Sequence, residues 1–290
     1  MTEPDLDGKT YIVTGANTGI GRVTALELAR RGGRVMLATR SKEKTDPVLA
    51  EITATGGRAE WVPLDLSSLA SVRSAADDIH TRTKRLDGLV DNAGLAGSRG
   101  MTNDGFEITF GTNHLGHFLL TTLLMDLLEA SAPSRVVVVS SKAHYRAKSI
   151  DWDGLTMPTK SLTGFPEYSV SKLCNVLFAH ELARRAKDRG IHTYALHPGV
   201  IASDIWRRIP WPLRPILTMG MLTTEEGARA PLHCIASTAA EKETGLYYDA
   251  DCRLKEPSDL AKSDSLAQEL WQKSEDWTRS AAARARAQTC

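Results

Sequence analysis

The sequence has few cysteines, and they lie far apart. None of the four belongs to a C-x-x-C pair, and none has a histidine at a metal-ligand spacing. A disulfide framework and a zinc site both need such spacings, so the sequence favours neither. We therefore expect no metal in this protein. The cysteines are Cys174, Cys234, Cys252 and Cys290.

Long hydrophobic runs are also missing. The longest apolar stretch, residues 118–128, is interrupted by two threonines and Asp126, and it falls far short of the roughly 20 residues that cross a bilayer. The N-terminal sequence MTEPDLDGKT is acidic and polar, whereas a secretory signal needs a basic start followed by an apolar run. We expect a cytoplasmic protein without a transmembrane segment.

Charge of one sign is not in excess. The 36 Lys and Arg residues nearly balance the 35 Asp and Glu residues, for a net charge of +1. Without a basic tail or patch, the chain lacks the electrostatic pattern of a nucleic-acid-binding protein. Its 42% hydrophobic and 24% charged residues are typical of globular chains and exclude disorder and a coiled coil. An enzyme or a small-molecule-binding protein remains.

Short apolar runs alternate with amphipathic stretches along most of the chain. Most of these runs are continuously apolar, which is typical of strands covered on both faces of a parallel sheet. The alternation predicts an α/β fold: a single doubly wound Rossmann domain, a parallel seven-stranded sheet with helices on both faces. We assign residues 1–255 to this domain and 256–290 to a C-terminal helix and a flexible tail. The predicted strands are 10–14, 34–39, 60–64, 88–92, 135–140, 191–197 and 246–248, and predicted helices include 22–31, 70–84, 115–130 and 169–187.

A glycine-rich loop follows the first predicted strand. Gly15, Gly19 and Gly21 have the spacing G-x3-G-x-G and lead into a helix. Glycines allow a close approach of the backbone, and a helix N-terminus offers unpaired N–H groups to a pyrophosphate. A simple turn is the alternative, but the position after the first strand of an α/β chain favours a dinucleotide.

The end of the second predicted strand carries a cofactor-specificity signal. NAD-binding proteins usually have an acidic residue here that holds the ribose 2′-hydroxyl, but this chain has Thr39 followed by Arg40. A guanidinium pairs well with a 2′-phosphate, which favours NADP(H). Arg22 is a second candidate, and a solvated surface charge is the alternative for either arginine.

Tyr168 and Lys172 are four residues apart in a predicted helix, so their side chains share one face. A nearby cation could bring the phenol pKa from about 10 toward neutrality, as proton transfer requires. Ser169 and Lys172 also match S-x-x-K, but the S-D-N and K-T-G motifs of β-lactamase-like enzymes are absent. Ser141 stands at the end of a strand, where it either binds a substrate oxygen or caps a turn. Asn113 lies in or near a helix and has an exposed polar residue as its alternative.

Together these motifs resemble the short-chain dehydrogenase/reductase family. The loop TGANTGIG, Asp65 in LDL, DNAG at 91–94, the residues named above and HPG at 197–199 follow the family order. The stretches NHLGHFLLT, VVVVSSKAH, YSVSKLCNVLF and LHPGV are most similar to the retinol dehydrogenase-like branch. Many members of that branch have an apolar N-terminal anchor, which we do not find here.

The resemblance implies a role for each matching residue. Tyr168 would be the general acid/base, Lys172 would lower its pKa and hold the nicotinamide ribose, Ser141 would polarise the carbonyl, and Asn113 would anchor a water-linked proton relay. Two positions depart from the pattern, because Ser203 replaces a threonine and Asp91 replaces an asparagine. The implied cofactor-binding residues, with Arg40, are Gly15, Asn17, Thr18, Gly19, Ile20, Gly21, Asp65, Leu66, Asn92, Ala93, Gly94, Tyr168, Lys172, Pro198, Gly199, Val200 and Ser203.

The segment 205–222 is rich in Trp, Pro, Met and Arg and falls where the family has its substrate lid. Such side chains could line a large apolar pocket; core packing and a membrane-surface patch are the alternatives. We expect NADP(H)-dependent interconversion of a lipophilic alcohol and its aldehyde or ketone. A non-catalytic NADP(H) sensor or scaffold is the alternative, whereas the glycine spacing argues against a nucleotide-sugar epimerase. The resemblance leaves open a homo-oligomer.

Overall fold

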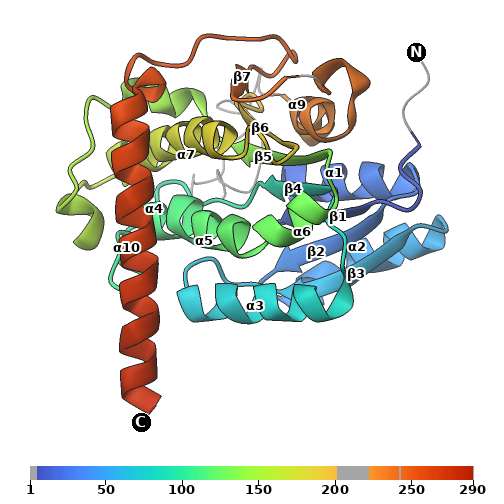
Figure 1. Ribbon diagram of the computed structural model, residues 1–290, viewed down its shortest axis with the longest axis horizontal. Coiled ribbons are helices and arrows are strands. Elements are labelled where there is room, and N and C mark those ends of the chain that lie inside the picture. The colour runs from blue at the N-terminus through green and yellow to red at the C-terminus, as the bar shows by residue number, and fades with distance from the viewer. Residues whose placement is uncertain (1–4, 201–221, 242, 290) are drawn as a thin grey trace, which may run out of the picture.

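The computed structural model describes residues 5–200, 222–241 and 243–289. Its centre is a seven-stranded sheet in the order β3-β2-β1-β4-β5-β6-β7, in which every pairing is parallel (Figure 1). The predicted fold class is confirmed. The strands are β1 (Thr10–Thr14), β2 (Arg34–Thr39), β3 (Arg58–Pro63), β4 (Gly88–Asp91), β5 (Ser134–Val139), β6 (Ile191–Leu196) and β7 (Leu246–Tyr248).

Helices cover both faces of the sheet, and each face has its own apolar core. The cluster on one face combines strand residues with α1, α2 and α9, and the cluster on the other includes α3, α5, α7 and α10. None of the helices in the described ranges is long and apolar enough to cross a membrane. The longer helices are α1 (Gly19–Arg30), α2 (Lys42–Ala54), α3 (Leu69–Arg82), α5 (Gly116–Leu123), α7 (Phe165–Arg185), α9 (Thr224–Ala236) and α10 (Asp264–Thr289), and the short ones are α4 (Ile108–Phe110), η1 (Gly111–Leu115), α6 (Met125–Ala130), η2 (Lys142–Arg146), η3 (Gly154–Thr156), η5 (Thr238–Ala240) and η6 (Leu260–Lys262).

The single helix predicted at 115–130 is wrong in detail, because the structure divides this stretch. A π-helical turn, η1, precedes α5, and Leu124 separates α5 from α6. The Thr122 hydroxyl donates to the carbonyl of Phe118 at 2.8 Å and to that of Leu119 at 3.0 Å. Such back-bonding bends helices and competes with their regular ladder.

Helix α10 crosses α7 and packs against it (Figure 1), and an aromatic side chain of α10 contacts rings on α5 and α7. The ring of Trp271 makes an edge contact with Phe118 at 5.0 Å and stacks on Phe178 at 5.9 Å. The guanidinium of Arg185 lies 4.4 Å from the centre of the Trp271 ring, an arrangement that adds cation–π attraction. The C-terminal region therefore contributes to the core; the predicted domain boundary at 255 and the flexible tail stay predictions.

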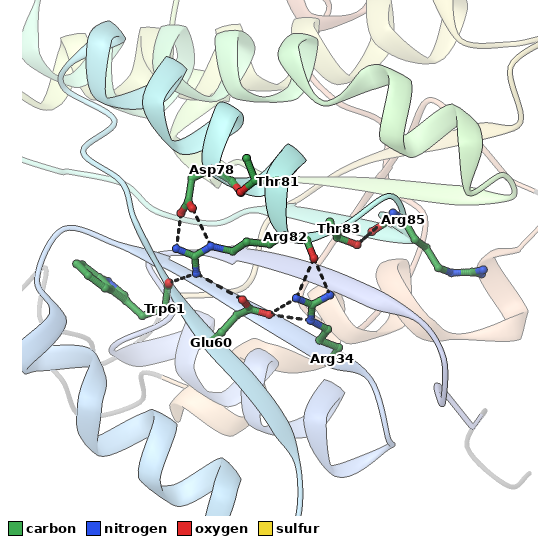
Figure 2. Close-up of polar contacts among 8 residues, drawn as sticks. All are labelled: Arg34, Glu60, Trp61, Asp78, Thr81, Arg82, Thr83 and Arg85. Atoms are coloured by element: carbon green, nitrogen blue, oxygen red, sulfur yellow. Dashed lines mark hydrogen bonds and ion pairs between the residues drawn. The ribbon is translucent and has the colours of Figure 1, made fainter.

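An ion-pair network joins the beginning of β2, strand β3 and the end of α3 (Figure 2). The Arg34 Nε atom donates to Glu60 at 2.7 Å, and the Arg82 Nε atom donates to Asp78 at 2.8 Å. Arg82 also donates to the carbonyl of Trp61 at 2.9 Å. Several charges linked in one network stabilise more than isolated surface pairs do, so the network anchors α3 to the edge of the sheet.

Candidate active site

Lys172 lies on α7, beside the carboxyl end of β5. Its Nζ atom donates to the carbonyl oxygen of Val139 at 2.8 Å, and its side chain is buried. Burial without a carboxylate partner disfavours the ammonium and lowers the pKa of Lys172 to about 8. A buried cation is thereby fixed where open parallel sheets place their ligands.

The side chains of Tyr168 and Ser141 lie close to each other and to this lysine. Burial raises the pKa of the Tyr168 phenol, and a hydrogen bond with the Ser141 side chain acts in the opposite direction. Lys172 Nζ lies 5.9 Å from the centre of the Tyr168 ring; that it lowers the phenol pKa stays a prediction. Of the two serines at the end of β5, Ser140 donates its hydroxyl to the carbonyl of Lys172 at 2.7 Å, so Ser141 is the one available to a substrate.

Asn113 is buried in the π turn η1 rather than exposed. Its Oδ1 accepts from the Leu95 N–H at 2.7 Å, and its Nδ2 donates to the Leu95 carbonyl at 2.9 Å and the Ser171 hydroxyl at 3.0 Å. Turns of this kind are frequent at functional sites. The side-chain amide thus holds the loop after β4 against α7, which leaves the relay assigned to Asn113 a prediction.

The glycine loop is closely packed against the loop after β4. Gly15 has φ of +67°, and a Cβ atom there would lie 3.0 Å from Cα of Ala93. A Cβ on Gly21 would lie 2.6 Å from the carbonyl oxygen of Gly15. A Cβ on Gly19, which has φ of +57°, would meet no described atom within 4 Å. The loop is therefore fixed on its inner side and open on its outer side.

Helix α1 begins at this loop with the chemistry of an anion site. Within the described ranges, its N-cap Thr18 makes no side-chain capping hydrogen bond, and its first turn has no acidic residue. Helix N-termini of this kind bind phosphate through backbone N–H groups and the helix dipole. With the open side of Gly19, the predicted loop of Gly15, Asn17, Thr18, Gly19, Ile20 and Gly21 fits a pyrophosphate.

Thr14 links the glycine loop to the DNAG segment. Its hydroxyl oxygen accepts from the N–H groups of Asn92 at 2.9 Å and Ala93 at 3.0 Å, and the Asn92 side chain donates to its carbonyl at 2.8 Å. Gly94 follows, and a Cβ there would lie 3.3 Å from Asn113 Oδ1 and 3.5 Å from Lys172 Nζ. The cofactor loop and the catalytic candidates therefore share one edge of the sheet.

The three side chains considered for cofactor specificity differ in whether a bound cofactor could contact them: Thr39, Arg40 and Arg22. The Thr39 hydroxyl is buried and lies 2.5 Å from that of Thr45, so it does not face a ribose. Arg22 is ion-paired with Glu51. Arg40 is exposed at the end of β2 and has no partner among the described residues. Of the two predicted arginines, Arg40 is the one available to an added phosphate.

The remaining predicted cofactor residues fall into three groups. The Asp65 carboxylate accepts from the N–H and hydroxyl of Ser67 at 3.0 and 2.7 Å, and the Leu66 side chain is in the core. Pro198 is buried and Val200 is 49% exposed at the end of β6; Gly199 between them has φ of +99°. Ser203 and residues 205–221 of the predicted lid lie outside the described residues.

The sequence pattern pointed to neither Ser171 nor His117. Ser171 accepts from Asn113 and donates to the carbonyl of Tyr168 at 2.8 Å. His117 contacts the Asn113 carbonyl at 3.0 Å and the Thr14 hydroxyl at 2.9 Å. Its contact with Asn113 is to a backbone carbonyl, which no pairing of side-chain types in the sequence signals. The described residues contain no cluster of metal-binding side chains.

Fold and site together define a dinucleotide-binding oxidoreductase, and comparison with known proteins specifies which. The short chain dehydrogenase family model matches residues 9–152. The chain is 43% identical over 280 residues to bovine dehydrogenase/reductase SDR family member 13, covering 93% of this chain and 73% of that protein. Human retinol dehydrogenase 11 is 42% identical over 92% of this chain and 84% of its own. A crystal structure of an uncharacterised protein from Mycobacterium Paratuberculosis, 33% identical, superposes with a TM-score of 0.77 and covers 96% of both chains.

The chain belongs to the short-chain dehydrogenase/reductase family, whose members use NAD(P)(H). It is an oxidoreductase related to the retinol dehydrogenases.

Proposed function

We propose that the protein interconverts a lipophilic alcohol and its aldehyde or ketone with NADP(H). The observation that carries this proposal is that the side chains of Tyr168 and Ser141 converge beside the buried Lys172. A phenol and a second hydroxyl that converge are suited to bind one carbonyl oxygen and exchange a proton with it.

The chain's own residues have separate tasks in this reaction. Ser141 orients the substrate oxygen, and Tyr168 donates a proton to it on reduction. Lys172, held by the Val139 carbonyl, supplies positive charge behind the phenol and holds the nicotinamide ribose. When bound, the cofactor supplies the hydride chemistry, and the protein supplies position and electrostatics.

Arg40 supports NADP(H) over NAD(H). The guanidinium is exposed and unpaired within the described ranges, and no acidic side chain stands at the end of β2. A 2′-phosphate would gain a charge-assisted pair there, whereas a 2′-hydroxyl would find no carboxylate acceptor.

The substrate class is supported by the name of one relative, a retinol dehydrogenase. Exposed apolar side chains also occur on the segments that follow β4 and β5 and at the end of β6: Met101, Met157 and Val200. A lipophilic substrate would find complementary surface at such positions.

A spectroscopic assay tests the proposal. Purified protein is given NADPH and a panel of retinoid, steroid and aliphatic carbonyls, and cofactor oxidation is followed by absorbance. We expect turnover that favours apolar carbonyls and exceeds turnover with NADH. NADPH binding without oxidation by any carbonyl would contradict an enzyme and favour the NADP(H) sensor.

A further inference from the structure

We propose that His144 is a positioning residue for Ser141, and that the segment after β7 orients it. This inference rests on the proposed function, because it concerns how the hydroxyl at that same site is held in place.

The imidazole of His144 lies between two backbone groups. Its Nδ1 is 2.7 Å from the carbonyl oxygen of Ser141, and its Nε2 is 3.2 Å from the backbone nitrogen of Ser258. A carbonyl only accepts and an N–H only donates. The ring is therefore neutral, with its proton on Nδ1 and a lone pair on Nε2.

Packing leaves this ring little freedom. His144 is fully buried, with the ring of Tyr145 centred 4.0 Å away and that of Tyr247 5.0 Å away. The hydroxyl of Tyr145 donates to the carbonyl of Glu256, so the same C-terminal segment also holds one of the two flanking rings. In agreement with a neutral ring, burial lowers the pKa of His144.

The bond from Nδ1 acts on the peptide group that orients Ser141. That carbonyl accepts from the backbone N–H of His144 at 3.1 Å as well as from the ring. On the other side of the turn, the Ser141 Oγ accepts from the Ala143 N–H at 3.2 Å. Residues of η2 thus hold both the carbonyl and the Oγ of Ser141, which keeps its hydroxyl beside Tyr168. Small displacements of groups positioned in this way lower reaction rates strongly.

Two conservative substitutions separate the two bonds. In H144N the amide nitrogen takes the place of Nδ1 and keeps the bond to the Ser141 carbonyl. In H144Q the longer side chain places its amide oxygen near the position of Nε2. It can then still accept from the Ser258 N–H but no longer donates to the Ser141 carbonyl. We expect kcat to fall about tenfold in H144Q, the loss of roughly one hydrogen bond, and most of that loss to be recovered in H144N. The dissociation constant of NADPH, measured by fluorescence, stays the same in both.

A double-mutant cycle distinguishes positioning from general support. If His144 acts through the Ser141 hydroxyl, H144Q lowers kcat in the wild type but adds little in the S141A background. S258A is the matched control, because it keeps the backbone N–H and removes a hydroxyl that has no partner among the described residues; its kcat is expected to be unchanged.

Equal kcat in H144N and H144Q, or an undiminished effect of H144Q on S141A, would overturn the positioning role. Melting temperatures of all variants show whether a loss of activity only follows a loss of folded protein. If the wild-type protein failed to oxidise NADPH with every carbonyl tested, the proposed function itself would be contradicted. The two failures are therefore distinct.

Discussion

The ammonium group of Lys172 is bound by the carbonyl oxygen of Val139, the last residue of β5, at 2.8 Å. This bond ties α7 to the strand that delivers Ser141 two residues later. Because the contact is to a neutral carbonyl, the charge of Lys172 is held in place without being neutralised. A buried, uncompensated cation is costly, and its cost is measurable.

The first prediction concerns the pH dependence of stability. The pKa of Lys172 is about 8 in the folded protein, against an ordinary value of 10.5. Between these two values the unfolded chain binds more protons than the folded one. Stability then rises with pH, by roughly 3 kcal/mol at most. We expect urea denaturation to show this rise from pH 8 to pH 10 in the wild type and a smaller rise in Lys172→Met. Identical slopes in the two proteins would contradict the low pKa.

The second prediction concerns the phenol. Tyr168→Phe removes only a hydroxyl, so we expect NADPH to bind as before while kcat falls by about 100-fold or more, as loss of a general acid does. Tyr194→Phe is the matched control, since that hydroxyl bonds to the Ala240 carbonyl at 2.6 Å away from the site. The control is expected to lose about 1 kcal/mol of stability and no kcat. Near-normal turnover in Tyr168→Phe would exclude the proposed mechanism.

The third prediction concerns cofactor choice. Arg40→Asp replaces a cation with a carboxylate able to accept from a ribose hydroxyl. We expect the ratio of kcat/KM for NADPH to that for NADH to fall by about 100-fold, since a charge-assisted pair is worth about 1.5–3 kcal/mol. Arg22→Ala serves for comparison, because Glu51 already occupies that arginine. If only the Arg22 variant changed the ratio, the assignment would pass to Arg22.

The fourth prediction concerns Asp91, the residue at which the sequence departs from the family pattern. Burial raises its pKa to about 8, the Thr121 hydroxyl donates to one of its oxygens at 2.9 Å, and the other oxygen has no partner within the described ranges. The folded state therefore binds the extra proton between about pH 4 and pH 8, so stability falls as pH rises there.

Asp91→Asn keeps the acceptor for Thr121 and removes the ionisation. We expect it to stabilise the protein on the order of 3 kcal/mol at pH 7 and to flatten the pH dependence, as calorimetry at several pH values would show. Asp77→Asn, on an exposed carboxylate of α3, is the control. A destabilised Asp91→Asn protein would refute the buried, protonated carboxyl.

The sheet was predictable because most of its strands are short, continuously apolar runs. The bounds predicted at 10–14, 34–39 and 246–248 are confirmed, since Gly or charged residues end those runs. Strand 60–64 instead occupies Arg58–Pro63, because pairing with β2 sets its ends. Helix α2 (Lys42–Ala54) is not among the predicted helices, because Pro47 and a weak apolar stripe obscure it.

The site was predictable only in part. Residues such as Tyr168 and Lys172 are visible because their spacing carries chemistry, but Ser171 and His144 act through contacts that only the folded chain creates. His144 bonds to Ser258, 114 positions away, and no local pattern signals such a contact. The same holds for Thr39, whose hydroxyl turns into the core because α2 brings Thr45 against it.

The charge network of Arg34, Glu60, Arg82 and Asp78 lies where β2 begins (Figure 2), whereas every catalytic candidate lies where strands end. The ion pairs that stabilise the fold and the residues proposed to carry out the reaction therefore lie at opposite ends of the strands. We expect substitutions in the charge network to change the stability toward heat or salt while leaving the reaction unchanged.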